Sequence, residues 1–68
     1  HPIAQGIAET YHATYDEVMT FFCSGVESED ITLAYQTAEL SGRDIKAVLT
    51  LWYDFGNWKD VWEELDLE

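Results

Sequence analysis

The chain has 68 residues, with fourteen acidic and three basic side chains and a net charge of −11. A chain of this length forms at most one small domain, and such a negative field repels phosphate backbones and anionic lipid surfaces. The composition of 47% apolar residues, including three Trp, four Tyr and three Phe, excludes a disordered chain. The single cysteine excludes an internal disulfide, and no apolar run approaches the roughly 18–20 residues of a membrane helix.

The first predicted helix covers residues 3–11, where three large apolar side chains recur every four positions. The second begins at Thr14, because Thr14 and Glu17 form the pattern of a capping box. We expect this helix to end near Gly25, in a left-handed cap.

A third helix is predicted from Ser28 to Gly42, with acidic residues in its first turn. The stretch Ser41–Asp44 fits the start of a fourth helix, which carries the strongest apolar period in the chain and stops at Gly56. Asn57 caps the last helix. No segment alternates with period two, so the sequence predicts an all-α fold: residues 1–68 as a single domain, a compact bundle of four to five short helices.

The second half of the sequence also partly repeats the first half, with matching residues 30 positions apart. Each unit has a helix, a glycine corner and a second capped helix. Helical-hairpin arrays usually need about three units for stability, and matches this short also arise by chance. Two helix–glycine turn–helix repeats and a chance similarity are therefore both open interpretations. The matching segments are Val18–Phe22 with Val48–Trp52, and Asp30-Ile31 with Asp60-Val61.

Loose apolar and glycine patterns run through nearly the whole chain. They are His1–Gln5, Tyr15–Met19, Gly25 with Asp30-Ile31, Leu33–Gln36, Gly56–Trp58 and Val61–Leu65. Together they resemble a small helical domain of uncharacterised secreted bacterial proteins. The resemblance implies an extracellular or cell-surface setting and no catalytic chemistry. The absence of an initiator Met is expected of a processed product or an excised fragment.

The sequence has no clear motif for DNA binding, catalysis or metal binding. DNA binding requires basic side chains, and the helices predicted after the two glycine corners carry only Lys59. The paired carboxylates lie at helix starts and surfaces, where capping explains them, so we predict no enzyme activity. His1 and His12 could together chelate a metal, but no full ligand set is present, and we predict no metal or cofactor. Cys23, beside Phe22, is expected to be a small buried side chain.

The aromatic residues exceed what a core of this size needs, and Tyr and Trp are common interface anchors. We expect Trp52 and Trp62 in the core and place the candidate interface elsewhere. The stretch from His1 to Gly42 holds seven acids and no lysine or arginine, so it could meet the basic segment of a neighbouring copy. The leading hypothesis is a non-enzymatic structural subunit that self-associates, as a homo-oligomer or an extracellular filament or array. The alternative is a monomeric acidic module that docks a partner, ideally one with a basic surface, through an aromatic patch. The candidate interface residues are Phe22, Arg43, Lys46, Tyr53, Trp58 and Lys59.

Overall fold

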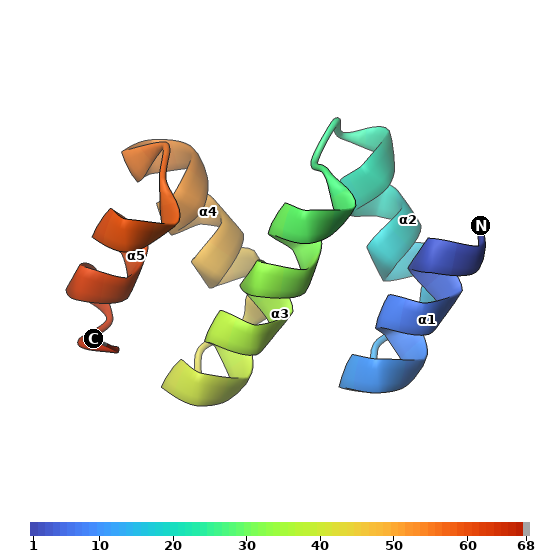
Figure 1. Cartoon of the computed structure of the whole chain (residues 1–68), viewed down its shortest axis with the longest axis horizontal. Helices are drawn as coiled ribbons and strands as arrows, with labels where there is room; N and C mark the ends of the chain where they lie inside the picture. The colour runs from blue at the N-terminus through green and yellow to red at the C-terminus, as the bar shows by residue number, and fades with distance from the viewer. Residues whose placement is uncertain (68) are drawn as a thin grey trace. The chain divides into compact units, whose positions relative to one another are not determined.

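The computed structural model describes residues 1–67, so Glu68, the last residue of the predicted domain, lies outside the description. Within the described residues there are helices and no strand (Figure 1). The predicted all-α fold of four to five short helices is confirmed. The helices are α1 (Pro2–Tyr11), α2 (Tyr15–Cys23), α3 (Ser28–Ser41), α4 (Ile45–Phe55) and α5 (Trp58–Glu64).

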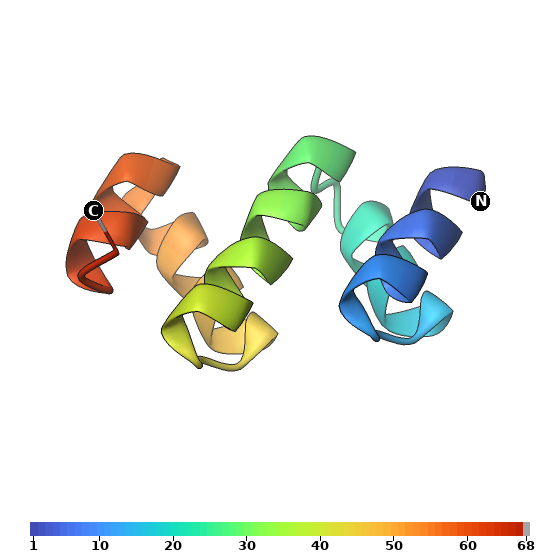
Figure 2. The same cartoon turned by 60° about the horizontal axis from the view of Figure 1, so that its bottom comes forward.

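The chain divides into two compact units. The first unit is His1–Leu33, and the second begins at Ala34, so the boundary falls inside α3. In the first unit α1 packs on α2, and in the second α4 packs on α5 (Figure 2). The core of the first unit contains Ala4, Ile7, Ala8, Val18, Val26 and Ile31; that of the second contains Ala34, Tyr35, Thr37, Ile45, Val48, Leu49, Trp58 and Val61.

The end of α2 is fixed by a glycine in the left-handed conformation. Gly25 has a φ of 90°, and its N–H donates to the carbonyl of Phe22 at 3.0 Å. The N–H of Val26 donates to the carbonyl of Phe21 at 3.1 Å, and the Val26 side chain is buried. This pair of bonds is a Schellman motif, in which the apolar residue after the glycine packs back on the helix. The predicted left-handed cap at Gly25 is confirmed.

Side-chain caps start two of the helices as predicted. The hydroxyl of Thr14 accepts from the N–H of Glu17 at 3.1 Å, and the amide oxygen of Asn57 accepts from the N–H of Asp60 at 3.0 Å. Each bond satisfies a backbone donor that the first turn of a helix leaves free. The start of α4 differs, because the side chain of Asp44 makes no capping hydrogen bond there.

The spacing that relates the two halves of the sequence also relates helices of the structure, which favours a true repeat over a chance similarity. Three pairs of equivalent helix boundaries are separated by the same spacing as the matching sequence segments, and three pairs of equivalent side chains are each completely buried. The units differ at the glycine corners, where α4 is two residues longer than α2 and its connection to the next helix is correspondingly shorter. The lengths of α1, α3 and α5 also differ, with 10, 14 and 7 residues. The boundary pairs are Tyr11/Ser41, Tyr15/Ile45 and Ser28/Trp58; the buried pairs are Ala4/Ala34, Val18/Val48 and Ile31/Val61.

The repeat gives a matched test of backbone strain at the ends of α1 and α3. His12 and Gly42 occupy equivalent positions, with φ of 57° and 71°. A left-handed residue with a Cβ costs roughly 1–2 kcal/mol, and the flexibility that glycine adds to the unfolded chain offsets part of the gain from replacing it. We therefore expect His12→Gly to raise the free energy of unfolding by about 0.5–1 kcal/mol.

Gly42→Ala is the reverse substitution, which introduces a Cβ where the original chain has a left-handed glycine. A Cβ at Gly42 would meet no atom within 4 Å, so only the backbone conformation opposes it, and we expect a loss of about 1 kcal/mol. Urea denaturation followed by circular dichroism measures both variants. If both substitutions lower the stability, the two caps are not equivalent in energy.

Candidate interaction surface

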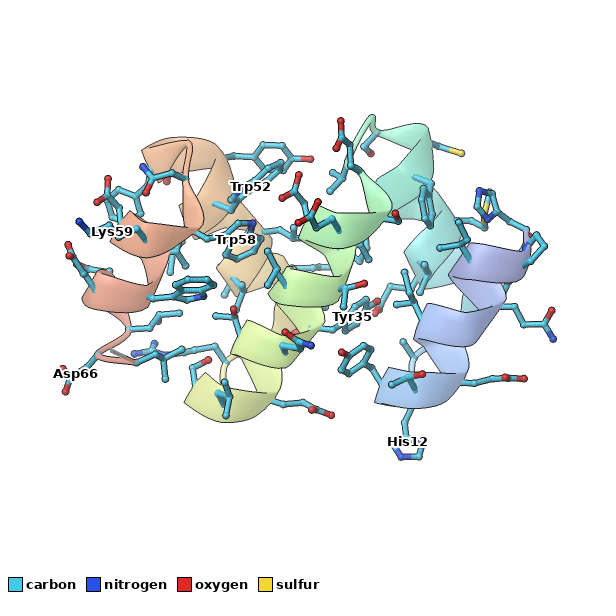
Figure 3. All side chains as sticks on the ribbon, viewed as in Figure 1. His12, Tyr35, Trp52, Trp58, Lys59 and Asp66 are labelled. Atoms are coloured by element: carbon cyan, nitrogen blue, oxygen red, sulfur yellow. The ribbon has the colours of Figure 1, made fainter. Side chains whose placement is uncertain are left out.

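The three tryptophans form a stacked cluster in the second unit. Trp58 lies between the other two: its ring centroid is 5.8 Å from that of Trp52 and 6.3 Å from that of Trp62, with interplanar angles of 18° and 26°. Figure 3 shows Trp58 beside Trp52, with its side chain directed inward from α5. The indole N–H of Trp62 donates to the hydroxyl of Thr37 at 2.9 Å. Thr37 is buried, so this bond satisfies its hydroxyl inside the protein.

The burial of Trp58 corrects the expectation that it forms part of an exposed surface. Its side chain is only 9% exposed, whereas Trp52 and Trp62, which were expected in the core, are half-buried. The reason is the short connection through Gly56 and Asn57. It turns α5 back on α4 at once, so the first residue of α5 faces Trp52 rather than solvent.

Several other large apolar side chains are exposed. Tyr53 is 58% exposed and contacts the ring of Trp52 at a centroid distance of 5.2 Å. Leu40 is 75% exposed and Phe55 41% exposed. The predicted residue Phe22 is half-buried and stacks on the ring of His1 at 4.6 Å. The sequence prediction therefore included Tyr53 and omitted Leu40 and Phe55.

The basic side chains are segregated along the chain. Arg43, Lys46 and Lys59 are exposed, and all three belong to the second unit. The first unit has six acidic residues and no lysine or arginine, so its net charge is −6. The second unit has eight acidic residues beside its three basic ones, so its net charge is −5, and both units are acidic. The units differ in that only the second offers lysine and arginine side chains to a neighbour.

The two histidines lie at opposite ends of one helix. His1 caps the start of α1, where its Nδ1 accepts from the N–H of Ala4 at 3.3 Å, and His12 ends the same helix. A helix of ten residues is about 15 Å long, so the two imidazoles are not placed to share one metal ion. Within residues 1–67 no group of three His, Cys, Asp or Glu side chains is placed to hold a metal.

Cys23 is exposed, which corrects the prediction that it is buried. It is the last residue of α2, and the buried residue of that helix is Val18, five positions earlier. At 100° per residue, position 23 faces away from the side that Val18 buries.

None of the helices in the described part of the chain combines the length and the apolar character needed to cross a bilayer. Comparisons with family models, with characterised proteins and with solved structures find no match to this chain.

Proposed function

We propose that this protein is a non-enzymatic structural subunit that associates with copies of itself through aromatic and charge-complementary surfaces. The observation that carries the proposal is the combination of exposed apolar side chains with segregated charge. Exposed apolar side chains alone, or an uneven charge distribution alone, are common on a monomer. Together they favour contact with another protein surface that offers apolar side chains and the opposite charge.

The exposed apolar residues occur in both units. Tyr53, Phe55 and Leu40 are in the second, and Ile3 and Tyr15 are in the first. Leaving such side chains in water adds nothing to the stability of a small chain, which buries a smaller fraction of its surface than a larger domain does. Association would cover them and stabilise the folded chain by mass action.

The placement of the basic side chains favours contact between the first unit of one copy and the second unit of another. All three basic side chains, Arg43, Lys46 and Lys59, lie in the second unit, whose net charge is −5, so attraction between copies depends on these side chains meeting the base-free first unit of a neighbour. Contact between different surfaces on identical chains is heterologous. Its product is a closed ring or an open filament, depending on the rotation between successive copies.

An extracellular or cell-surface location and a place among the small secreted helical domains of bacteria are part of this proposal. They rest on the sequence patterns around Tyr15, Leu33 and Gly56 that resemble such domains. The acidic surface also favours a protein partner over nucleic acid.

The purified protein should form oligomers or filaments without any added partner. Sedimentation velocity from micromolar to millimolar concentration at neutral pH, with a reducing agent present, should show a rising average mass. Electron microscopy then distinguishes rings from filaments. Tyr53→Ser combined with Leu40→Ser should shift association to higher concentration, because both side chains are exposed and the fold does not depend on them. A strictly monomeric protein over this range contradicts the proposal.

The alternative function is a monomeric acidic module that docks a partner with a basic surface. The exposure of Tyr53 favours it, because an exposed aromatic side chain is a typical interface anchor. This function predicts a monomer at every concentration and retention of the protein on a basic partner, with retention reduced by Tyr53→Ser.

A further inference from the structure

Exposed carboxylates border the exposed large apolar side chains of the second unit. Glu39 precedes Leu40, which is 75% exposed, in the last turn of α3. Asp54 lies between Tyr53 and Phe55, which are 58% and 41% exposed, in the last turn of α4. Glu39 and Asp54 are themselves exposed. A contact that covers these apolar side chains therefore brings a carboxylate to its edge.

While they are ionised, the two carboxylates oppose such a contact between copies. A carboxylate loses hydration when an apolar surface closes beside it, and removing an unpaired charge from water is costly. The copies also repel each other, because each carries a net charge of −11. Protonation of Glu39 and Asp54 removes the charge at the edge of the contact and reduces both costs.

The charged groups around Glu39 and Asp54 are mostly acidic as well. α5 packs on α4, and it is joined to α3 by the hydrogen bond between Trp62 and Thr37. The phenols of the second unit stay neutral over the whole acidic range. Five acids and three bases remain, so the surroundings do not offset the two carboxylates. Within residues 34–67 these other charged residues are Arg43, Asp44, Lys46, Lys59, Asp60, Glu63, Glu64 and Asp66.

We propose that Glu39 and Asp54 act as a proton-dependent gate on self-association, which is weak while both are ionised and strengthens when they are protonated. The gate rests on the self-association proposed above and supplies its regulation. Its sign follows from linkage. A contact that disfavours ionised carboxylates binds more protons than the separate chains do, so a fall in pH favours association.

Amide substitutions imitate the protonated state and test the gate. The original chain should associate at about a tenfold lower concentration at pH 5.0 than at pH 7.5. Glu39→Gln combined with Asp54→Asn should show about the same gain already at pH 7.5 and a smaller response to pH. Sedimentation velocity at a constant ionic strength of about 0.1 M measures the association with equal screening at both pH values. Circular dichroism confirms that each variant is helical.

Glu9→Gln combined with Glu63→Gln is the matched control. Glu9 is the repeat equivalent of Glu39, but Thr10 follows it in place of an exposed apolar residue. Glu63, like Asp54, is an exposed residue in the last turn of its helix. Both pairs of substitutions change the net charge from −11 to −9 and remove acids from helix ends where the dipole disfavours them. The control should strengthen association much less and keep the full response to pH.

The histidines also gain charge as the pH falls to 5.0. His1 and His12 are present in the original chain and in both variants, so their titration contributes equally to all three. The difference between the two pairs of substitutions therefore reports the carboxylates that border the apolar side chains.

The outcomes separate the two proposals. If the original chain is monomeric at both pH values, self-association fails and the gate fails with it. If the original chain associates equally at both pH values, or the two pairs of substitutions strengthen association to the same extent, only the gate is overturned.

Discussion

Trp58→Ala is expected to lower the free energy of unfolding by about 3–5 kcal/mol, the usual range for removing a buried tryptophan. The side chain is 9% exposed and stacks on both Trp52 and Trp62, so truncation leaves a cavity between two aromatic rings. Stability on the order of 0.05–0.15 kcal/mol per residue gives roughly 3–10 kcal/mol for a chain of this size. The variant should therefore be largely unfolded or close to it at room temperature.

Tyr53→Ala provides the control within the same cluster. Tyr53 also contacts Trp52, but it is 58% exposed, so its removal should change the stability by less than about 1 kcal/mol. Urea denaturation followed by circular dichroism compares the two variants. Equal losses would show that the tryptophan stack does not organise the second unit.

Ile31→Ala is expected to cost about 2–5 kcal/mol, because Ile31 is completely buried in α3. Ile31 belongs to the first unit, whereas all three tryptophans belong to the second. Each unit has about half the chain, and chains below about 40 residues rarely fold without disulfides, metals or association. The unit boundary also falls inside a continuous helix. We therefore expect the units to unfold together, as the single domain of residues 1–68 predicts.

Tryptophan fluorescence distinguishes two units that unfold together from two units that unfold independently. Since the first unit has no tryptophan, fluorescence reports the second unit alone and circular dichroism reports both. In a single cooperative transition, Ile31→Ala lowers the urea midpoint of both signals equally. Independent units would keep the original fluorescence midpoint while the circular dichroism curve splits in two. Val61→Ala is the equivalent change in the second unit. If the two units unfold together, its fluorescence and circular dichroism curves should coincide.

The helices and their ends could be predicted from the sequence because they depend on neighbouring residues. The hydroxyl of Thr14, the amide of Asn57 and the positive φ of Gly25 each act within a few positions along the chain. The repeat was also visible, because equivalent core positions need apolar residues of similar size.

The candidate surface was less predictable because exposure depends on where a connection turns the chain. Trp58 and Cys23 are both apolar residues next to a glycine corner, and the structure places one inside and the other outside. The sequence placed Trp58 in the candidate interface because it could not show that α5 folds back at its first residue.

The equal spacing of the helix boundaries also determines which insertions and deletions the fold can accept. Each residue added to or removed from α3 rotates the rest of that helix by about 100° and turns its apolar side away from the core. An insertion of one whole repeat, beginning at an equivalent position, instead returns every later helix to its original phase. Lengthening by whole repeats is thus compatible with this architecture, whereas a shift of one or two positions within α3 is not.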